Sequence, residues 1–137
     1  MKIAIVSDIH GNATALKAVL KDIQSFSVDL IISLGDNIGY GPEPEEVVGL
    51  LRSQNIPSVI GNHELAINRP RFLSWFNPNA RTSLEKTKHL ISQSTTDYIS
   101  KLSYCMILSN CRFVHGFPPG SATVYLFELS EEKYCSD

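Results

Sequence analysis

IAIVSDIHGN, residues 3–12, places an aspartate and a histidine directly after a short apolar run. A short run rich in β-branched residues predicts a fully buried strand over residues 2–7. A second apolar run leads into GDNIG (35–39), and a third leads into GNHE (61–64). Open α/β sheets bind their ligands at the carboxyl ends of parallel strands. The three strand ends therefore predict one site built from carboxylate, imidazole and amide side chains.

The segments between these runs have helical character. The apolar side chains of Leu16, Val19, Leu20 and Ile23 recur at helical spacing, after Asn12 as a candidate cap. Pro44 suits the first turn of a helix over roughly 45–53. With buried strands at 29–34 and 58–60, this β-α-β-α-β order favours a parallel sheet with helical crossovers.

The second half of the chain has a different pattern. Helical propensity over 79–93 makes Leu84, Leu90 and Ile91 available to the core, and a short helix from Thr95 or Thr96 would end near Leu102. An antiparallel hairpin is predicted from 104–108 and 111–115, turning at Ser109-Asn110. A weakly alternating strand is predicted over 123–129, and 130–137 is polar.

Composition limits the class of protein. The chain has 137 residues, 43% of them hydrophobic, which suits one domain over 1–137. A net charge of −2 gives no basic excess for general nucleic-acid binding. No apolar run approaches the ~20 residues of a membrane span, and no signal-peptide pattern is visible. Three cysteines without CxxC spacing indicate reduced thiols, so we expect a cytoplasmic protein.

Asp8, His10 and Asp36 carry the first part of the predicted site. Asp8 and His10 are two residues apart, so their side chains can point the same way from an extended segment. Carboxylate with imidazole suits Mn, Fe or Zn better than Ca or Mg. The alternative is that Asp8 caps the next helix and His10 is polar surface. Asp36 can donate an oxygen to each of two metals held ~3.5–4 Å apart.

The GNHE block and His115 supply the second part. Asn62 offers a neutral amide oxygen as a ligand. His63 diverges from it on an extended segment and is well placed as a general acid, while Glu64 could hold the far ring nitrogen of His63. The alternative is a helix N-terminus with a favourable acidic residue. His115 follows a predicted strand and is expected to bind metal, whereas His89 is expected on the surface.

These blocks, together with VHG (114–116), resemble the successive motifs of the calcineurin-like metallophosphoesterase superfamily. GYGPEP (39–44) and FNPNAR (76–81) resemble a bacterial and archaeal branch related to serine/threonine protein phosphatases and diadenosine tetraphosphatases. The resemblance covers essentially the whole chain. It implies an α/β fold, a four-layer α/β/β/α sandwich whose second sheet starts at the 104–115 hairpin.

The resemblance also implies roles for individual residues. The two ligand sets are Asp8, His10 and Asp36 for one metal ion, and Asp36, Asn62 and His115 for the other. His63 would act as general acid or stabilise the transition state, with Glu64 beside it as the second catalytic residue. A metal-bridging hydroxide would attack phosphorus in line. The cofactors would be two divalent transition-metal ions among Mn, Fe, Zn, Ni and Co, with Mn favoured.

Two departures from the family pattern shape the functional expectation. No Gly-His-x-His block occurs in the sequence, so we expect the second sheet to be incomplete. The chain would then be a fragment of a longer enzyme, or a short form whose incomplete sheet is covered in a homo-oligomer. The Asp36 loop lacks the arginine that holds phosphate in protein phosphatases. We expect hydrolysis of a phosphomonoester or phosphodiester in a small phosphorylated or nucleotide substrate. The alternative is an inactive or weakly active metal-binding module that works by association. A Rossmann-like binder is set aside, because no G-x-G-x-x-G follows the first strand.

Overall fold

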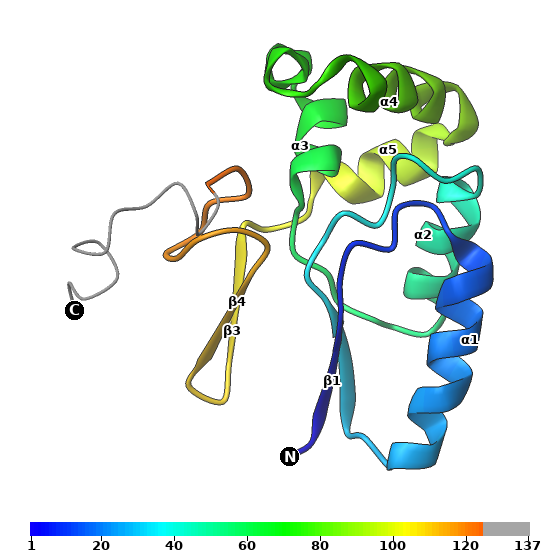
Figure 1. The fold of residues 1–137 in the computed structure, drawn as a ribbon. Helices are drawn as coiled ribbons and strands as arrows, with labels where there is room; N and C mark the ends of the chain where they lie inside the picture. Colours follow the sequence, from blue (N-terminus) through cyan, green and yellow to red (C-terminus); the bar gives the residue numbers. More distant parts are fainter. Residues whose placement is uncertain (125–137) are drawn as a thin grey trace.

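Two parallel strands stand at the centre of the fold. In the computed structural model, residues 1–124 are described; β1 (Ile3–Val6) pairs in parallel with β2 (Leu30–Ser33). The predicted parallel arrangement is therefore confirmed for these strands. Both run toward the same end of the molecule, where the loops that follow them lie side by side (Figure 1).

The third predicted strand is reduced to single bridges. Ser33 pairs with Ser58, and Val59 pairs with Ser103, both in parallel. These bridges bring the segment before Gly61 beside β2. The expected strand over 58–60 is thus present only as isolated pairs, but it still carries the chain to the carboxyl end of the sheet.

Helices cover the sheet on one side and close its carboxyl end. They are α1 (Ala13–Ile23), α2 (Pro44–Ser53), α3 (Asn62–Asn68), α4 (Pro78–Leu90) and α5 (Gln93–Ser100), with short 3-10 helices η1 (Gln24–Phe26) and η2 (Pro70–Trp75). Figure 1 shows α1 and α2 together beside the strands, and α3, α4 and α5 grouped where the strands end. None of the described helices combines the length and apolar character needed to cross a bilayer.

Side-chain caps fix where the helices begin. Asn12 accepts a hydrogen bond from the amide of Ala15 (2.9 Å), as predicted. Ser92 accepts from the amide of Thr95 (3.1 Å), so α5 begins at Gln93 rather than at a threonine. Two buried clusters follow, one between α1 and α2 and one formed by α2, α3, α4 and α5.

The predicted hairpin is confirmed. It consists of β3 (Cys105–Leu108) and β4 (Cys111–Val114), an antiparallel pair separate from the first sheet. Ser109 and Asn110 have φ of 48° and 61°, the left-handed values that a tight hairpin turn requires. Cys105 and Cys111 are free thiols. The predicted strand at 123–129 lies mostly outside the described residues, and 130–137 lies wholly outside them.

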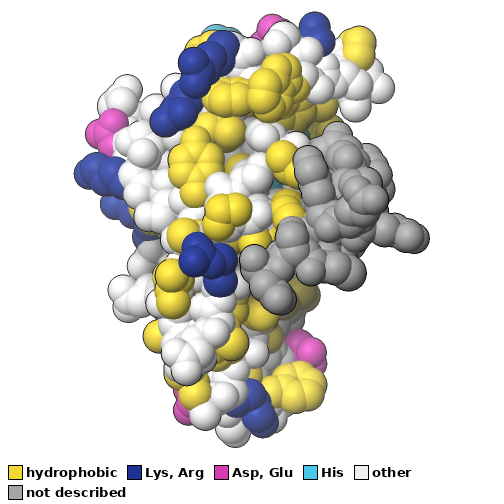
Figure 2. Space-filling view, turned by 90° about the vertical axis from the view of Figure 1, so that its left-hand side faces the viewer, with side chains coloured by type: hydrophobic (Ala, Val, Ile, Leu, Met, Phe, Trp, Pro, Cys, Tyr) yellow, Lys and Arg dark blue, Asp and Glu magenta, His cyan; other side chains and the backbone are white. Residues whose placement is uncertain are grey.

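Several side chains predicted to be buried are exposed. Ile5 is 54% exposed, although Ile32, its neighbour on the same face, is fully buried. The reason is that β1 is the edge strand among the described residues, so the prediction of a fully buried first strand was wrong. Val19 and Leu90 are also more than 40% exposed. Further hydrophobic side chains are exposed on the side of the molecule that carries β3 and β4 (Figure 2).

Candidate metal centre

The loops after β1 and β2 are hydrogen-bonded to each other along their backbones. The amide of Asp8 donates to the carbonyl of Gly35 (3.1 Å), and the amide of His10 donates to the carbonyl of Asp36 (2.9 Å). Asp8, His10 and Asp36 all have positive φ, at 54°, 49° and 52°. Such values are unfavourable for residues with a Cβ, and they persist only where neighbouring contacts hold them. The paired loops therefore fix the side chains in one arrangement.

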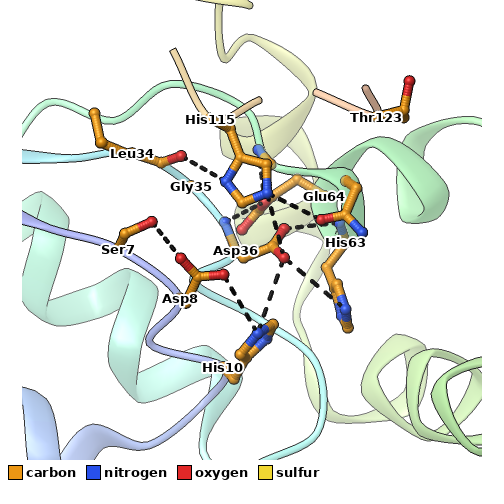
Figure 3. A network of polar contacts seen from close by, with 12 residues as sticks. Ser7, Asp8, His10, Leu34, Gly35, Asp36, His63, Glu64, His115 and Thr123 are labelled. Atoms are coloured by element: carbon orange, nitrogen blue, oxygen red, sulfur yellow. Dashed lines mark hydrogen bonds and ion pairs between the residues drawn. The ribbon is translucent and has the colours of Figure 1, made fainter. Parts of the chain in front are cut away.

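Three predicted ligands, Asp8, His10 and His115, lie around the carboxylate of a fourth, Asp36 (Figure 3), and the fifth, Asn62, lies beside His115. His10 Nε2 lies 3.8 Å from Asp8 Oδ1 and 3.9 Å from Asp36 Oδ2. His115 Nε2 lies 3.0 Å from Asn62 Oδ1 and 3.6 Å from the same Asp36 oxygen. Residues separated by more than 100 positions in the sequence thus meet at one carboxylate.

Backbone carbonyls orient the two imidazoles. His115 Nδ1 lies 2.9 Å from the carbonyl oxygen of Leu34, and His10 Nδ1 lies 3.2 Å from that of Ile38. A carbonyl only accepts hydrogen bonds, so in the neutral imidazole Nδ1 carries the proton and donates it. This leaves Nε2 of each ring unprotonated and directed at the carboxylate, the arrangement that metal-binding histidines adopt.

The donor set fits divalent cations. With Nδ1 protonated, His115 Nε2 directs a lone pair toward the oxygens of Asn62 and Asp36, where a cation would relieve the repulsion between these electron-rich atoms. The same holds for His10 with Asp8 and Asp36. Two groups of potential ligand atoms lie within 4.8 Å of one another: His10, Asp36 and His63, and Asp8, Asp36 and His115. Both groups share Asp36, although they divide the other residues differently from the sets implied by the resemblance.

The environment of Asp36 disfavours the ionised form of its side chain. Its side chain is only 4% exposed, and burial together with the nearby Glu64 raises its pKa from 3.8 to about 8. The amide of His63 opposes the shift by donating to Asp36 Oδ1 (2.9 Å). A carboxylate held in this environment gains most from a bound metal ion.

This shift predicts how Mn²⁺ stabilises the protein at different pH. Since the folded-state pKa of Asp36 is raised, its contribution to stability is present below about pH 4 and is lost as the pH rises through about 8. A cation that binds the ionised carboxylate offsets this loss. We expect Mn²⁺ to raise Tm at both pH values, and the rise at pH 8 should exceed the rise at pH 6 by roughly 3 °C or more. Equal gains at both pH values, measured by calorimetry, would contradict the assignment.

His63 is a buried, neutral imidazole. It is 3% exposed, and burial, together with the neighbouring imidazoles of His10 and His115, lowers its pKa to about 3. Its Nε2 lies 4.0 Å from Asp36 Oδ2, and its Nδ1 has no hydrogen-bond partner among the described residues. A ring in this state can offer a hydrogen bond to a bound ligand from one nitrogen.

Gly39 leaves the space that the His63 ring needs. Gly39 has φ of +89°, and a Cβ placed there would lie 2.1 Å from His63 Nδ1. Gly39→Ala should therefore displace the ring and lower the phosphoester turnover expected from the sequence by about 100-fold, the scale of a lost acid–base group. Gly49→Ala is the matched control, because nothing lies within 4 Å of its new Cβ in α2. Equal kcat values in the two variants would refute a role for the position of His63.

Glu64 does not hold the His63 ring, so the interaction expected from the sequence was wrong. Glu64 Oε2 accepts from the amides of Asp36 and Gly61 (both 3.0 Å), and Oε1 accepts from the amide of Asn37 (2.7 Å). The expectation assumed an extended GNHE segment, whereas α3 begins at Asn62, with Glu64 in its first turn. The alternative of a helix N-terminus with an acidic residue describes Glu64 correctly.

A comparison with known families agrees with this geometry. The model of the family described as calcineurin-like phosphoesterase matches residues 1–131. The chain belongs to the calcineurin-like phosphoesterase family. The description of this family refers to the hydrolysis of phosphoesters.

Individual proteins and solved structures are also similar to the chain. The crystal structure of a metallophosphoesterase from Sphaerobacter thermophilus is 42% identical, with a TM-score of 0.75 over 92% of this chain and 51% of that one. An uncharacterized protein from Methanocaldococcus jannaschii is 39% identical over 100 residues, which are 73% of this chain and 41% of that protein. Serine/threonine-protein phosphatase 2 of Escherichia coli K12 is 46% identical over 61 residues, 44% of this chain and 28% of that protein. The chain thus spans about half or less of these relatives.

The cluster of predicted metal ligands opens into a pocket of about 530 Å³. Its polar wall includes Asp8, Asp36 and His63, and none of the described lining residues is Lys or Arg. Sequence analysis did not assign the aromatic lining residues Tyr40, Phe72, Trp75 and Phe76 to the site. It also missed the carbonyls of Leu34 and Ile38, which leave no side-chain signal in the sequence.

Two predictions about single residues also have clear outcomes. Asn12, not Asp8, caps α1, so the capping alternative for Asp8 was wrong. Ser7 Oγ donates instead to the Asp8 carboxylate (2.5 Å). His89 is exposed on α4, as expected.

Proposed function

We propose that this chain hydrolyses a phosphomonoester or phosphodiester with two divalent transition-metal ions, Mn²⁺ favoured. The observation that carries the proposal is the convergence of two oriented imidazoles on the buried Asp36 carboxylate. The ligand sets we propose are Asp8, His10 and Asp36 for one ion, and Asp36, Asn62 and His115 for the other. Because no Lys or Arg is among the described pocket residues, the ions would also balance the charge of the phosphate.

Metal ions in such a site supply a water of lowered pKa and neutralise charge on the phosphoryl oxygens. The residues of the chain would hold the substrate and the ligand side chains in position. Neutral His63 would donate a hydrogen bond toward the departing oxygen or an equatorial phosphoryl oxygen. Glu64 keeps the Asp36 turn in place through its three backbone hydrogen bonds, so we propose a positioning role for it rather than a catalytic one.

The proposal includes the arrangement of the domain. We propose one domain over 1–137, in which β3 and β4 belong to an incomplete second sheet of a four-layer α/β/β/α sandwich. The separate pairing of the hairpin and the family match over 1–131 support this arrangement. A small phosphorylated molecule or nucleotide is the proposed substrate, since the pocket volume lies in the range of small-molecule sites.

Metal content and turnover test the proposal together. The metal-free chain, loaded with Mn²⁺ and passed through a desalting column, should retain two ions per chain by elemental analysis. It should then hydrolyse p-nitrophenyl phosphate or bis-p-nitrophenyl phosphate, and EDTA should abolish this activity. Two bound ions without turnover of either ester would favour the alternative of a metal-binding module that works by association.

A further inference from the structure

An aromatic wall lines the same pocket as the predicted metal ligands. Its members are Tyr40 from the loop after β2, Phe72 and Trp75 from η2, and Phe76 directly after it. Trp75 is 66% exposed and Tyr40 is 55% exposed. Phe72 and Phe76 are half-buried and also pack against the core cluster formed by α2, α3, α4 and α5. Exposed aromatic side chains beside a polar site, such as Tyr40 and Trp75, are typical of ligand-binding surfaces.

The aromatic wall begins where the polar cluster ends. The His63 ring lies between them, with its centroid 4.9 Å from that of Tyr40 and 5.1 Å from that of Phe76. Phe72 and Trp75 extend the wall, their rings packed edge-to-face at 4.7 Å. If the phosphate of a substrate lies near Asp36, the group esterified to it would therefore extend from the metal-ligand residues to the aromatic rings.

Helix α4 holds both parts of the wall in place. The Arg81 guanidinium donates to the carbonyls of Ser74 (2.8 Å) and Phe76 (2.7 Å), which fastens the segment that carries three of the rings. The amide of Tyr40 donates to Ser83 Oγ (2.6 Å), which fastens the fourth. Because the anchors are backbone hydrogen bonds to one helix, the wall exists before a ligand arrives, and less ordering is needed on binding.

We propose that Tyr40, Phe72, Trp75 and Phe76 form a nucleobase subsite, so that the substrate is a nucleotide. The inference rests on the proposed function for its phosphate end, but the subsite itself needs no metal. Nucleobases are flat and weakly hydrated, and they stack face to face on aromatic side chains. Asn77 and Thr123 also line the pocket and supply polar side chains for the edge of a base.

The only tryptophan in the sequence makes the subsite directly observable. Adenosine, titrated into the intact chain in EDTA, should quench Trp75 fluorescence in a saturable manner, and ribose should not. Tyr40→Ala and Phe76→Ala should each weaken adenosine binding by roughly 10- to 100-fold, the scale of one lost stacking partner. Phe26→Ala removes an exposed aromatic residue of η1 outside the pocket and should leave the titration unchanged. Circular dichroism tests whether each variant is folded. If Phe76→Ala does not fold, Tyr40→Ala, at an exposed position, still tests the subsite.

The outcomes separate this inference from the proposed function. Absence of saturable quenching, or equal adenosine affinity in all folded variants, would overturn the subsite, even if Mn²⁺-dependent turnover of p-nitrophenyl phosphate is found. Adenosine binding that the Tyr40 and Phe76 variants weaken supports the subsite, even if no phosphoester is hydrolysed. In the Mn²⁺-loaded chain, the subsite also predicts a higher KM for adenosine 5′-monophosphate in Tyr40→Ala than in the parent chain.

Discussion

Asp36→Asn is expected to abolish Mn²⁺-dependent phosphoesterase turnover, with a loss of about 1000-fold or more. Asp36 Oδ2 lies within 4.0 Å of Nε2 of His10, His63 and His115, so this one oxygen lies near all three imidazoles of the site. An amide of the same shape keeps the volume but removes the charge that draws cations to the site. A thousandfold loss corresponds to about 4 kcal/mol of transition-state stabilisation.

The same variant should not destabilise the metal-free protein. The carboxyl group is buried near Glu64 and its pKa is raised to about 8, so replacing it removes a group whose ionisation is unfavourable in the folded protein. The amide oxygen can still accept from the amide of His63. We therefore expect kcat/KM to collapse while the metal-free Tm stays the same or rises.

Asp22→Asn is the matched control, since Asp22 is exposed on α1 and lies outside the pocket. It should leave turnover, metal content and Tm unchanged. An Asp36→Asn protein that still retains two Mn²⁺ ions and near-parental turnover would show that Asp36 is not the shared ligand.

Glu64→Ala is expected to lower the free energy of unfolding by about 3–5 kcal/mol. Glu64 is fully buried and accepts from the amides of Asp36, Asn37 and Gly61. Truncation leaves these buried donors without their acceptor, and each unsatisfied group costs about 1–3 kcal/mol. Removing one partner from a buried charged network is destabilising on the same scale. Urea denaturation of the metal-free protein measures the loss.

Glu64→Gln separates this account from a direct action on His63. Gln retains the shape and one acceptor oxygen, so it should lose roughly half as much stability as Ala. Glu85→Ala, at an exposed position on α4, should lose less than about 0.5 kcal/mol. A Glu64→Gln protein of parental stability but greatly reduced kcat would instead support the hypothesis that Glu64 acts on the His63 ring.

The sequence predicts the site more completely than it predicts the sheet around it. Asp8, His10 and Asp36 are brought together because parallel strands end at one edge, and this follows from the apolar runs alone. The hairpin turn at Ser109-Asn110 places His115 at the same edge. These predictions depend on strand order, which short apolar runs and turn residues specify well.

What the sequence could not predict depends on tertiary context. The burial of Ile5 depends on what lies beside an edge strand, and a residue pattern does not contain that information. The direction of Glu64 depends on α3 beginning at Asn62, a boundary that sequence patterns define poorly. The aromatic wall depends on the 3-10 segment η2, whose position is fixed by hydrogen bonds from Arg81 to backbone carbonyls.

Diffraction from crystals of the Mn²⁺-loaded chain, with anomalous data collected at the manganese edge, tests the central claim most directly. We predict two ions within coordination distance of Asp36, one of them contacting His10 and the other contacting His115. A single ion, or ions that touch neither histidine, would contradict the two-metal site proposed here.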